Sequence, residues 1–112
     1  LCVRRYKMDA QLKKGFLEFC VLASLKNKDS YGYQIVKDVS RYIEISESTL
    51  YPILKRLEVS GCVITYTEQH KNRLRKYYRI TDKGIESIRC FLGEWKEIQS
   101  IYEYIKGEME HE

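Results

Sequence analysis

Residues 46–61, SESTLYPILKRLEVSG, carry the clearest pattern in the chain. Four aliphatic residues recur there at i, i+3, i+4 and i+7, which is the spacing of one buried helical face. These residues are Leu50, Ile53, Leu54 and Leu57. Ser46 can cap the start of such a helix, and Gly61 stands where a helix stop is expected. The stretch therefore predicts a short amphipathic helix.

The face opposite the leucines is polar. With about 100° per residue, one side of the wheel collects Ser48, Tyr51, Pro52 and Lys55. This side offers a hydroxyl, a phenol and an ammonium and no carboxylate, and these groups donate to phosphate or read a base edge. We therefore predict that residues 46–61 form the recognition helix of a winged helix-turn-helix, with Ser46 among its DNA contacts.

Pro52 lies inside this helical pattern, where it removes one backbone hydrogen bond at a cost of about 3 kcal/mol. Either the regular helix begins only near Leu50, or the helix bends at Pro52. In both cases we expect the backbone N–H groups of Ser48 and Thr49 to be free at the positive end of the helix, which suits a phosphate.

The composition is typical of one folded domain. The chain has 112 residues, of which 44% are hydrophobic and 32% are charged. It contains no apolar run of the length that a membrane span needs, so we expect a cytoplasmic protein. Met8 opens a more natural start than Leu1, and residues 1–7 are therefore expected to be an extension or a remnant of cloning. The net charge of +4 permits nucleic-acid binding without requiring it.

Two further helices are predicted before the recognition helix. The pattern over residues 9–28 is apolar nearly all round, which requires two packing partners. One partner is the same domain, and the other is expected to be a second subunit. Residues 31–42 form the next helix, with Tyr33 on its polar side. The short turn at 43–45 then completes a helix-turn-helix.

The period changes to two after Gly61, which predicts strands at 62–67 and 74–80. The polar link 68–73, EQHKNR, joins them into a β-hairpin, and this hairpin would be the wing. Of the adjacent tyrosines 77 and 78, we expect Tyr78 in the core and the other exposed. Residues 71–79, KNRLRKYYR, hold five cations and no acid. The expected contacts with phosphates or the minor groove are Lys71, Arg73, Arg75 and Lys76.

A last helix is predicted from Thr81 to about Gly107. Apolar residues recur there at steps of 3 and 4, which is a heptad seam for pairing with another helix. The seam consists of Ile88, Phe91, Trp95, Ile98, Tyr102, Ile105 and Met109. Because no other element is long enough to cover it, we predict a homodimer whose interface also includes Phe16 and Phe19.

The expected fold is therefore mainly α with a small β-hairpin (α+β). A winged helix-turn-helix domain would cover residues 9–80, and a dimerisation helix would cover residues 81–109. We expect this last helix to pack with helix 9–28 of the partner.

Three blocks of the chain resemble the PadR-like transcriptional regulators: YGYQIVKDV, STLYPILKRLEVSG and RKYYRITDKG. The resemblance covers about residues 9–107 and implies a homodimeric repressor that binds an inverted-repeat operator on double-stranded DNA. The short C-terminal region, a single helix, resembles that of the small subgroup of this family, which includes a lactococcal multidrug-binding repressor. There, a tryptophan of this helix lines a hydrophobic pore at the dimer interface. The resemblance therefore implies a pocket for a small aromatic or hydrophobic effector at Trp95, Phe91 and Leu92.

The sequence gives poor support to an enzyme. The chain has no Ser-His-Asp, Cys-His or Gly-rich phosphate motif at a workable spacing, and its cysteines form no CxxC pair. We therefore expect no enzyme, no cofactor and no metal site. Trp95 can instead be dimer core, and Tyr33 and Tyr51 can be amphipathic surface residues. The alternative function is a winged helix that binds only protein, but such a wing would not need five cations.

Overall fold

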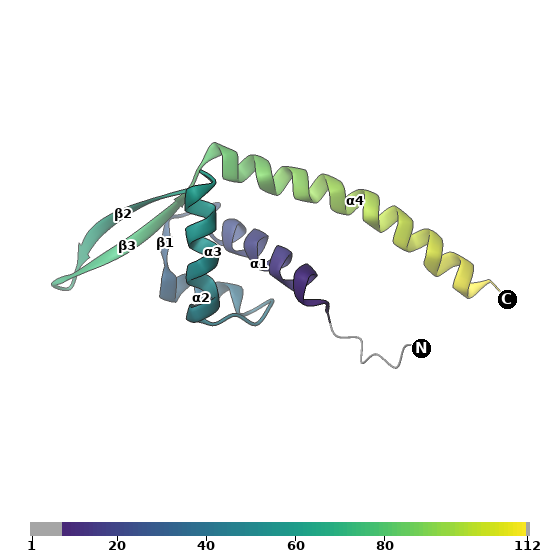
Figure 1. Cartoon of the computed structure of the whole chain (residues 1–112), viewed down its shortest axis with the longest axis horizontal. Helices are drawn as coiled ribbons and strands as arrows, with labels where there is room; N and C mark the ends of the chain where they lie inside the picture. Colours follow the sequence, from purple (N-terminus) through teal and green to yellow (C-terminus); the bar gives the residue numbers. More distant parts are fainter. Residues whose placement is uncertain (1–7, 112) are drawn as a thin grey trace.

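The computed structural model describes residues 8–111, and this part contains four helices and one three-stranded antiparallel sheet (Figure 1). The prediction for residues 1–7 lies outside the described residues. The elements are α1 (Ala10–Ser24), β1 (Ser30–Tyr31), α2 (Gly32–Val39), α3 (Glu47–Val59), β2 (Val63–His70), β3 (Arg73–Ile80) and α4 (Asp82–Glu110). The predicted α+β fold with a hairpin and a long last helix is confirmed.

Helix α3 has the predicted cap and the predicted buried face. Ser46 Oγ accepts a hydrogen bond of 3.3 Å from the Thr49 N–H, and Gly61 follows the helix with a φ of +83°. All four leucine-face side chains are buried. The idea that the helix begins only near Leu50 is wrong, because α3 is continuous from Glu47. The expectation of a free N–H at Thr49 is also wrong, because that group donates its hydrogen bond to the Ser46 side chain.

The first two helices end earlier than predicted. Helix α1 ends at Ser24 and α2 at Val39, several residues short of the expected ends at 28 and 42. A polar segment follows α1, and the chain then enters a strand that the sequence pattern did not reveal. In this strand, β1, Ser30 pairs with Tyr78 and Tyr31 with Tyr77. Two residues are too few to show a period of two.

The wing is a longer hairpin with a tighter turn than expected. Strands β2 and β3 pair from Val63 and Ile80 down to His70 and Arg73. The predicted link 68–73 is therefore reduced to two residues, both with positive φ, 50° at Lys71 and 64° at Asn72. This is the turn that matches the twist of a two-residue hairpin.

The core lies between the first three helices and the inner face of the sheet. The helices contribute Val21, Leu22, Ile35, Leu50 and Leu54, and each of these side chains is at most 1% exposed. Tyr78 joins them from β3, as predicted. The inner face of the wing is thereby fixed against α3, where Thr65 Oγ1 also donates to Glu58 Oε2 at 3.2 Å.

Helix α4 begins on a cap and then leaves the rest of the chain. Thr81 Oγ1 accepts from the Gly84 N–H at 3.2 Å and donates to the Gly61 carbonyl at 2.6 Å. The helix passes over α1 and projects beyond it (Figure 1). Between residues 8 and 111, no helix is long and apolar enough to span a lipid bilayer.

The first half of the predicted seam packs inside the chain. Phe91 stacks on Phe19 at 4.3 Å between ring centroids, and Trp95 meets Phe16 edge-on at 5.5 Å. In the single chain this half of the seam packs on α1, although Phe91 and Trp95 remain partly exposed, and the prediction that it also faces a second subunit stays a prediction. From Ile98 onward, all the seam residues are exposed.

Candidate nucleic-acid interface

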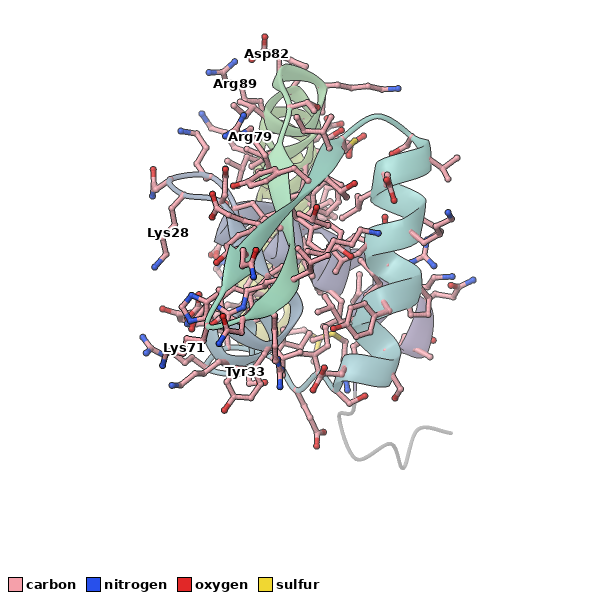
Figure 2. The ribbon with its side chains drawn as sticks, turned by 90° about the vertical axis from the view of Figure 1, so that its left-hand side faces the viewer. Lys28, Tyr33, Lys71, Arg79, Asp82 and Arg89 are labelled. Atoms are coloured by element: carbon pink, nitrogen blue, oxygen red, sulfur yellow. The ribbon has the colours of Figure 1, made fainter. Side chains whose placement is uncertain are left out.

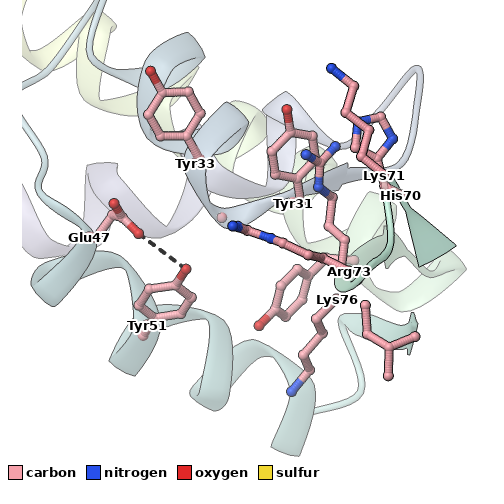
Figure 3. A pocket seen from close by; sticks show the side chains of 12 residues that line it. Tyr31, Tyr33, Glu47, Tyr51, His70, Lys71, Arg73 and Lys76 are labelled. Carbon is pink, nitrogen blue, oxygen red and sulfur yellow. Dashed lines mark hydrogen bonds between the residues drawn. The ribbon is translucent and has the colours of Figure 1, made fainter. Parts of the chain in front are cut away.

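A groove of about 790 Å³ separates the start of α3 from the wing (Figure 3). Helix α2 contributes Tyr33 to its walls, and α3 contributes Tyr51. The wing contributes all four of the predicted cations, which are Lys71, Arg73, Arg75 and Lys76. The structure thus brings six of the predicted DNA contacts together around one groove. Figure 2 shows Lys71 and Tyr33 at the same end of the molecule, where the tip of the wing lies.

The other predicted contacts on α3 lie outside this groove. Ser46 Oγ lies 3.0 Å from Ser48 Oγ and 3.1 Å from Thr49 Oγ1, so the three hydroxyls form one exposed cluster at the helix start. Pro52 faces a separate hollow beside α1, and Lys55 faces another. The polar side of the wheel is exposed as predicted, but only Tyr51 turns toward the wing.

Tyr51 is held in place by two neighbours. Its hydroxyl donates to Glu47 Oε2 at 3.3 Å, and a Cβ added at Gly32 would overlap this hydroxyl (Figure 3). Partial burial and then the Glu47 carboxylate raise the pKa of Tyr51 above its ordinary value. The Tyr51 ring therefore lies directly against Gly32 at the edge of the groove, and a side chain at position 32 would force the hydroxyl end of the ring to move.

Glu47 is a lining residue that the sequence reasoning missed. It occupies the first turn of α3, where an acid favours the positive end of a helix whatever else it does. That general role hides any other role, because an acid is common at this position. The spacing did carry a signal, because Glu47 lies four residues before Tyr51 and therefore on the same face of the helix.

The cations of the wing differ in their contacts with the rest of the chain. By strand alternation Lys76 lies on the inner face, whereas Arg73 and Arg75 lie on the outer face. The Arg75 guanidinium sits 3.9 Å from the centroid of the Tyr31 ring and donates to the Tyr77 hydroxyl at 3.5 Å. A cation over an aromatic face is attracted by the ring. These two contacts therefore hold the Arg75 guanidinium in one orientation.

Arg79, the fifth cation of the basic stretch, is bound at the other end of the wing. It donates to both carboxylate oxygens of Asp29 at distances from 2.9 to 3.2 Å, and the Tyr66 hydroxyl donates to the same carboxylate at 2.5 Å. The Arg79 and Tyr66 hydrogen bonds lower the pKa of Asp29. The sequence could not show this pairing, because Asp29 and Arg79 lie 50 residues apart.

An aromatic row joins this ion pair to Arg75 across the outer face of the sheet. Tyr77 stacks on Tyr66 with centroids 5.5 Å apart and meets Tyr31 edge-on at 5.6 Å. Tyr77 is therefore half-buried, and the expectation that it would be exposed is wrong. The row fixes the wing to the segment that precedes α2.

A second, apolar hollow of about 200 Å³ lies between α1 and α4. Its walls include three predicted interface residues, Phe16, Phe19 and Ile98, together with the two aromatic residues of the predicted effector pocket, Phe91 and Trp95. Leu92, the third residue of that prediction, does not line the hollow and is exposed. The reason is geometric, because one residue along a helix turns the side chain by about 100°.

Comparison with known proteins shows which family the chain resembles. The model of the "Transcriptional regulator PadR-like family" matches residues 21–89. The smu.1704 structure from Streptococcus mutans is 38% identical, covers 97% of this chain and 100% of its own, and has a TM-score of 0.74. A PadR family transcription regulator from Clostridium difficile is 31% identical over 81% of this chain and 98% of its own, also with a TM-score of 0.74.

A third structure contains nucleic acid. Bacillus subtilis PadR in complex with operator DNA is 26% identical and covers 68% of this chain and 46% of that protein, with a TM-score of 0.62. The family match spans more than half of the chain and includes α2, α3 and the wing. The chain therefore belongs to the PadR-like family of transcriptional regulators.

Proposed function

We propose that this protein is a cytoplasmic repressor that binds an inverted-repeat operator as a homodimer. The groove between α3 and the wing supports this proposal most directly, because four cations and Tyr51 line it. A wing that bound only protein would be expected to offer an apolar core at this place. Phosphate oxygens are the natural partners of such a groove, and they supply much of the affinity for DNA.

The second half of α4 supports the homodimer. Ile98, Tyr102, Ile105 and Met109 continue the heptad seam, and each is between 47 and 75% exposed. A row of this kind is the surface that a second helix covers. Pairing through it would place two copies of α3 in successive major grooves about 34–36 Å apart.

The apolar hollow beside Trp95 supports an effector site at the same interface. It opens beside Ile98, where the exposed seam begins, so a second subunit would close it. A flat aromatic or hydrophobic molecule bound there would change the angle between the two winged domains. It regulates binding only if its affinity differs between the two arrangements. This site would place the protein with the small subgroup that includes the lactococcal repressor.

Single alanine substitutions of Lys76, which lines the groove, and of Lys55, which lies outside it on the exposed face of α3, test the two parts of the proposed DNA contact. Each change is expected to weaken binding to all DNA sequences about equally and to lower the slope of log K against log salt by about 0.9. Binding of labelled operator, selected from random duplexes, would be followed by fluorescence anisotropy over a range of salt. Lys96→Ala is the control, because Lys96 lies on α4 far from the groove. An unchanged slope for both Lys76→Ala and Lys55→Ala would contradict the proposed contact.

Trp95 reports on the effector site because it is the only tryptophan in the chain. Planar aromatic dyes are expected to quench its fluorescence with saturation, because stacking places them against the indole. Phe16→Ala should weaken this binding, since Phe16 packs on Trp95 across the hollow. Leu92→Ala, outside the hollow, should leave it unchanged. If no member of a broad dye panel quenches Trp95, the tryptophan is only part of the core.

A further inference from the structure

Glu47 is out of place in a groove built for phosphate. It is the only carboxylate among the described residues that line this groove, and four cations share the lining. Within residues 8–111 it nevertheless forms no ion pair with any of them. Its one side-chain hydrogen bond in this part of the chain is the one that it accepts from Tyr51. The carboxylate therefore retains acceptor capacity that faces the groove.

The chemistry of duplex DNA limits what this carboxylate can contact. The phosphates of DNA would repel the Glu47 carboxylate, so the sugar-phosphate backbone of the DNA is excluded as its partner. The major groove offers two amino donors, cytosine N4 and adenine N6, and carboxylates accept from cytosine N4. The first residues of a recognition helix are the ones that reach base edges, and Glu47 is the first residue of α3.

The Tyr51 hydroxyl acts on this carboxylate. Because its proton is donated to Glu47 Oε2, it is not available to a phosphate in this arrangement. Gly32 leaves the space that the tyrosine occupies on its other side. Tyr51 is thus a positioning residue that holds the Glu47 carboxylate in one orientation, in place of the phosphate contact expected from the sequence.

We propose that Glu47 determines sequence specificity by accepting a hydrogen bond from the N4 amino group of one cytosine in each half-site. This inference rests on the proposed DNA-binding function and assigns a base-reading role within it. A helix-stabilising acid in the first turn would be indifferent to the DNA sequence. Base preference therefore separates the two roles of Glu47.

The experiment compares the full-length chain with its Glu47→Gln variant. Operators are first selected from random duplexes with the unaltered protein, and every base pair of the half-site is then replaced in turn. Replacement of one C·G pair is expected to weaken binding of the unaltered protein about 5- to 100-fold. Glu47→Gln should lose this discrimination at that one position, or shift it toward adenine, because glutamine pairs with adenine. Its affinity for unrelated DNA should rise, because a repelling charge is gone.

Tyr51→Phe is the second variant, because it keeps the ring beside Gly32 and removes only the hydroxyl. It should reduce discrimination at the same base pair and leave the other positions unchanged. Lys76→Ala, by contrast, should weaken all sequences alike.

Three results would overturn the inference. If Glu47→Gln retains the base preferences of the unaltered protein at every position, Glu47 does not read a base. If Tyr51→Phe weakens all sequences equally, the hydroxyl contacts phosphate and does not position Glu47. If the unaltered protein selects no sequence at all, the proposed function fails as well, which the first two results do not imply.

Discussion

A chain that carries both Ile98→Asp and Ile105→Asp is expected to be monomeric at concentrations where the unaltered protein is a dimer. Both isoleucines are about half exposed in the single chain and lie on the seam of α4. In the proposed dimer each would be buried, and an unpaired buried charge costs about 3–5 kcal/mol. The two substitutions occur in both subunits, so four unpaired charges would lie in the proposed interface and oppose dimerisation.

The same variant should lose about a hundredfold or more in operator affinity. A monomer presents one copy of α3 to one half-site and loses the gain from linking two binding events. Sedimentation velocity would give the oligomeric state, and fluorescence anisotropy the affinity. The winged domain itself should remain folded, because neither residue belongs to the buried core.

A matched control exists on the opposite face of α4. Lys96→Gln combined with Ser100→Asp changes the net charge by the same two units, but both positions point away from the seam. This control should remain a dimer and bind the operator with little change. If the Ile98 and Ile105 variant also remains a dimer, the exposed half of the seam is not the interface.

The features that the sequence predicted well are local ones. The four buried residues and the cap of α3 were all visible because a helix repeats every 3.6 residues and its cap is adjacent. The hairpin was visible for the same reason, as an alternation. Its turn was placed too loosely because Lys71 and Asn72 adopt positive φ without a glycine to mark it.

The features that the sequence missed depend on contacts between distant segments. The ion pair of Asp29 with Arg79 and the pairing of β1 with β3 join residues that no period connects. The heptad seam illustrates a different limit. Its pattern shows that α4 must be covered, but not by which helix, and the structure divides it between α1 and an uncovered half.

The second large effect is expected from a substitution at Gly84, where α4 follows the wing. Gly84 lies in the first turn of α4, and a Cβ there would overlap the carbonyl oxygen of Cys62 and lie 2.7 Å from Ile80 Cγ1. The Cys62 carbonyl cannot simply move, because it accepts a hydrogen bond of 2.9 Å from the Thr81 N–H. Gly84→Ala is therefore expected to destabilise the fold by about 2–3 kcal/mol, as overpacking does.

Gly93→Ala is the matched control on the same helix, because a Cβ at Gly93 would meet nothing within 4 Å. Alanine is the better helix former by about 0.5–1 kcal/mol, so Gly93→Ala should be neutral or slightly stabilising. For Gly84→Ala the overlap outweighs that gain. At equal protein concentration, its thermal midpoint should fall by about 8–15 °C.

The same contact bears on DNA binding. Gly84 lets the start of α4 lie against the base of the wing, so the orientation of the proposed dimer helix follows that of the groove. If alanine shifts α4, the two copies of α3 change their separation. We therefore expect folded Gly84→Ala, measured by anisotropy below its melting range, to bind the operator more weakly than Gly93→Ala does. Equal stability and equal affinity for the two variants would show that the contact yields to a methyl group and that α4 is not rigidly coupled to the wing.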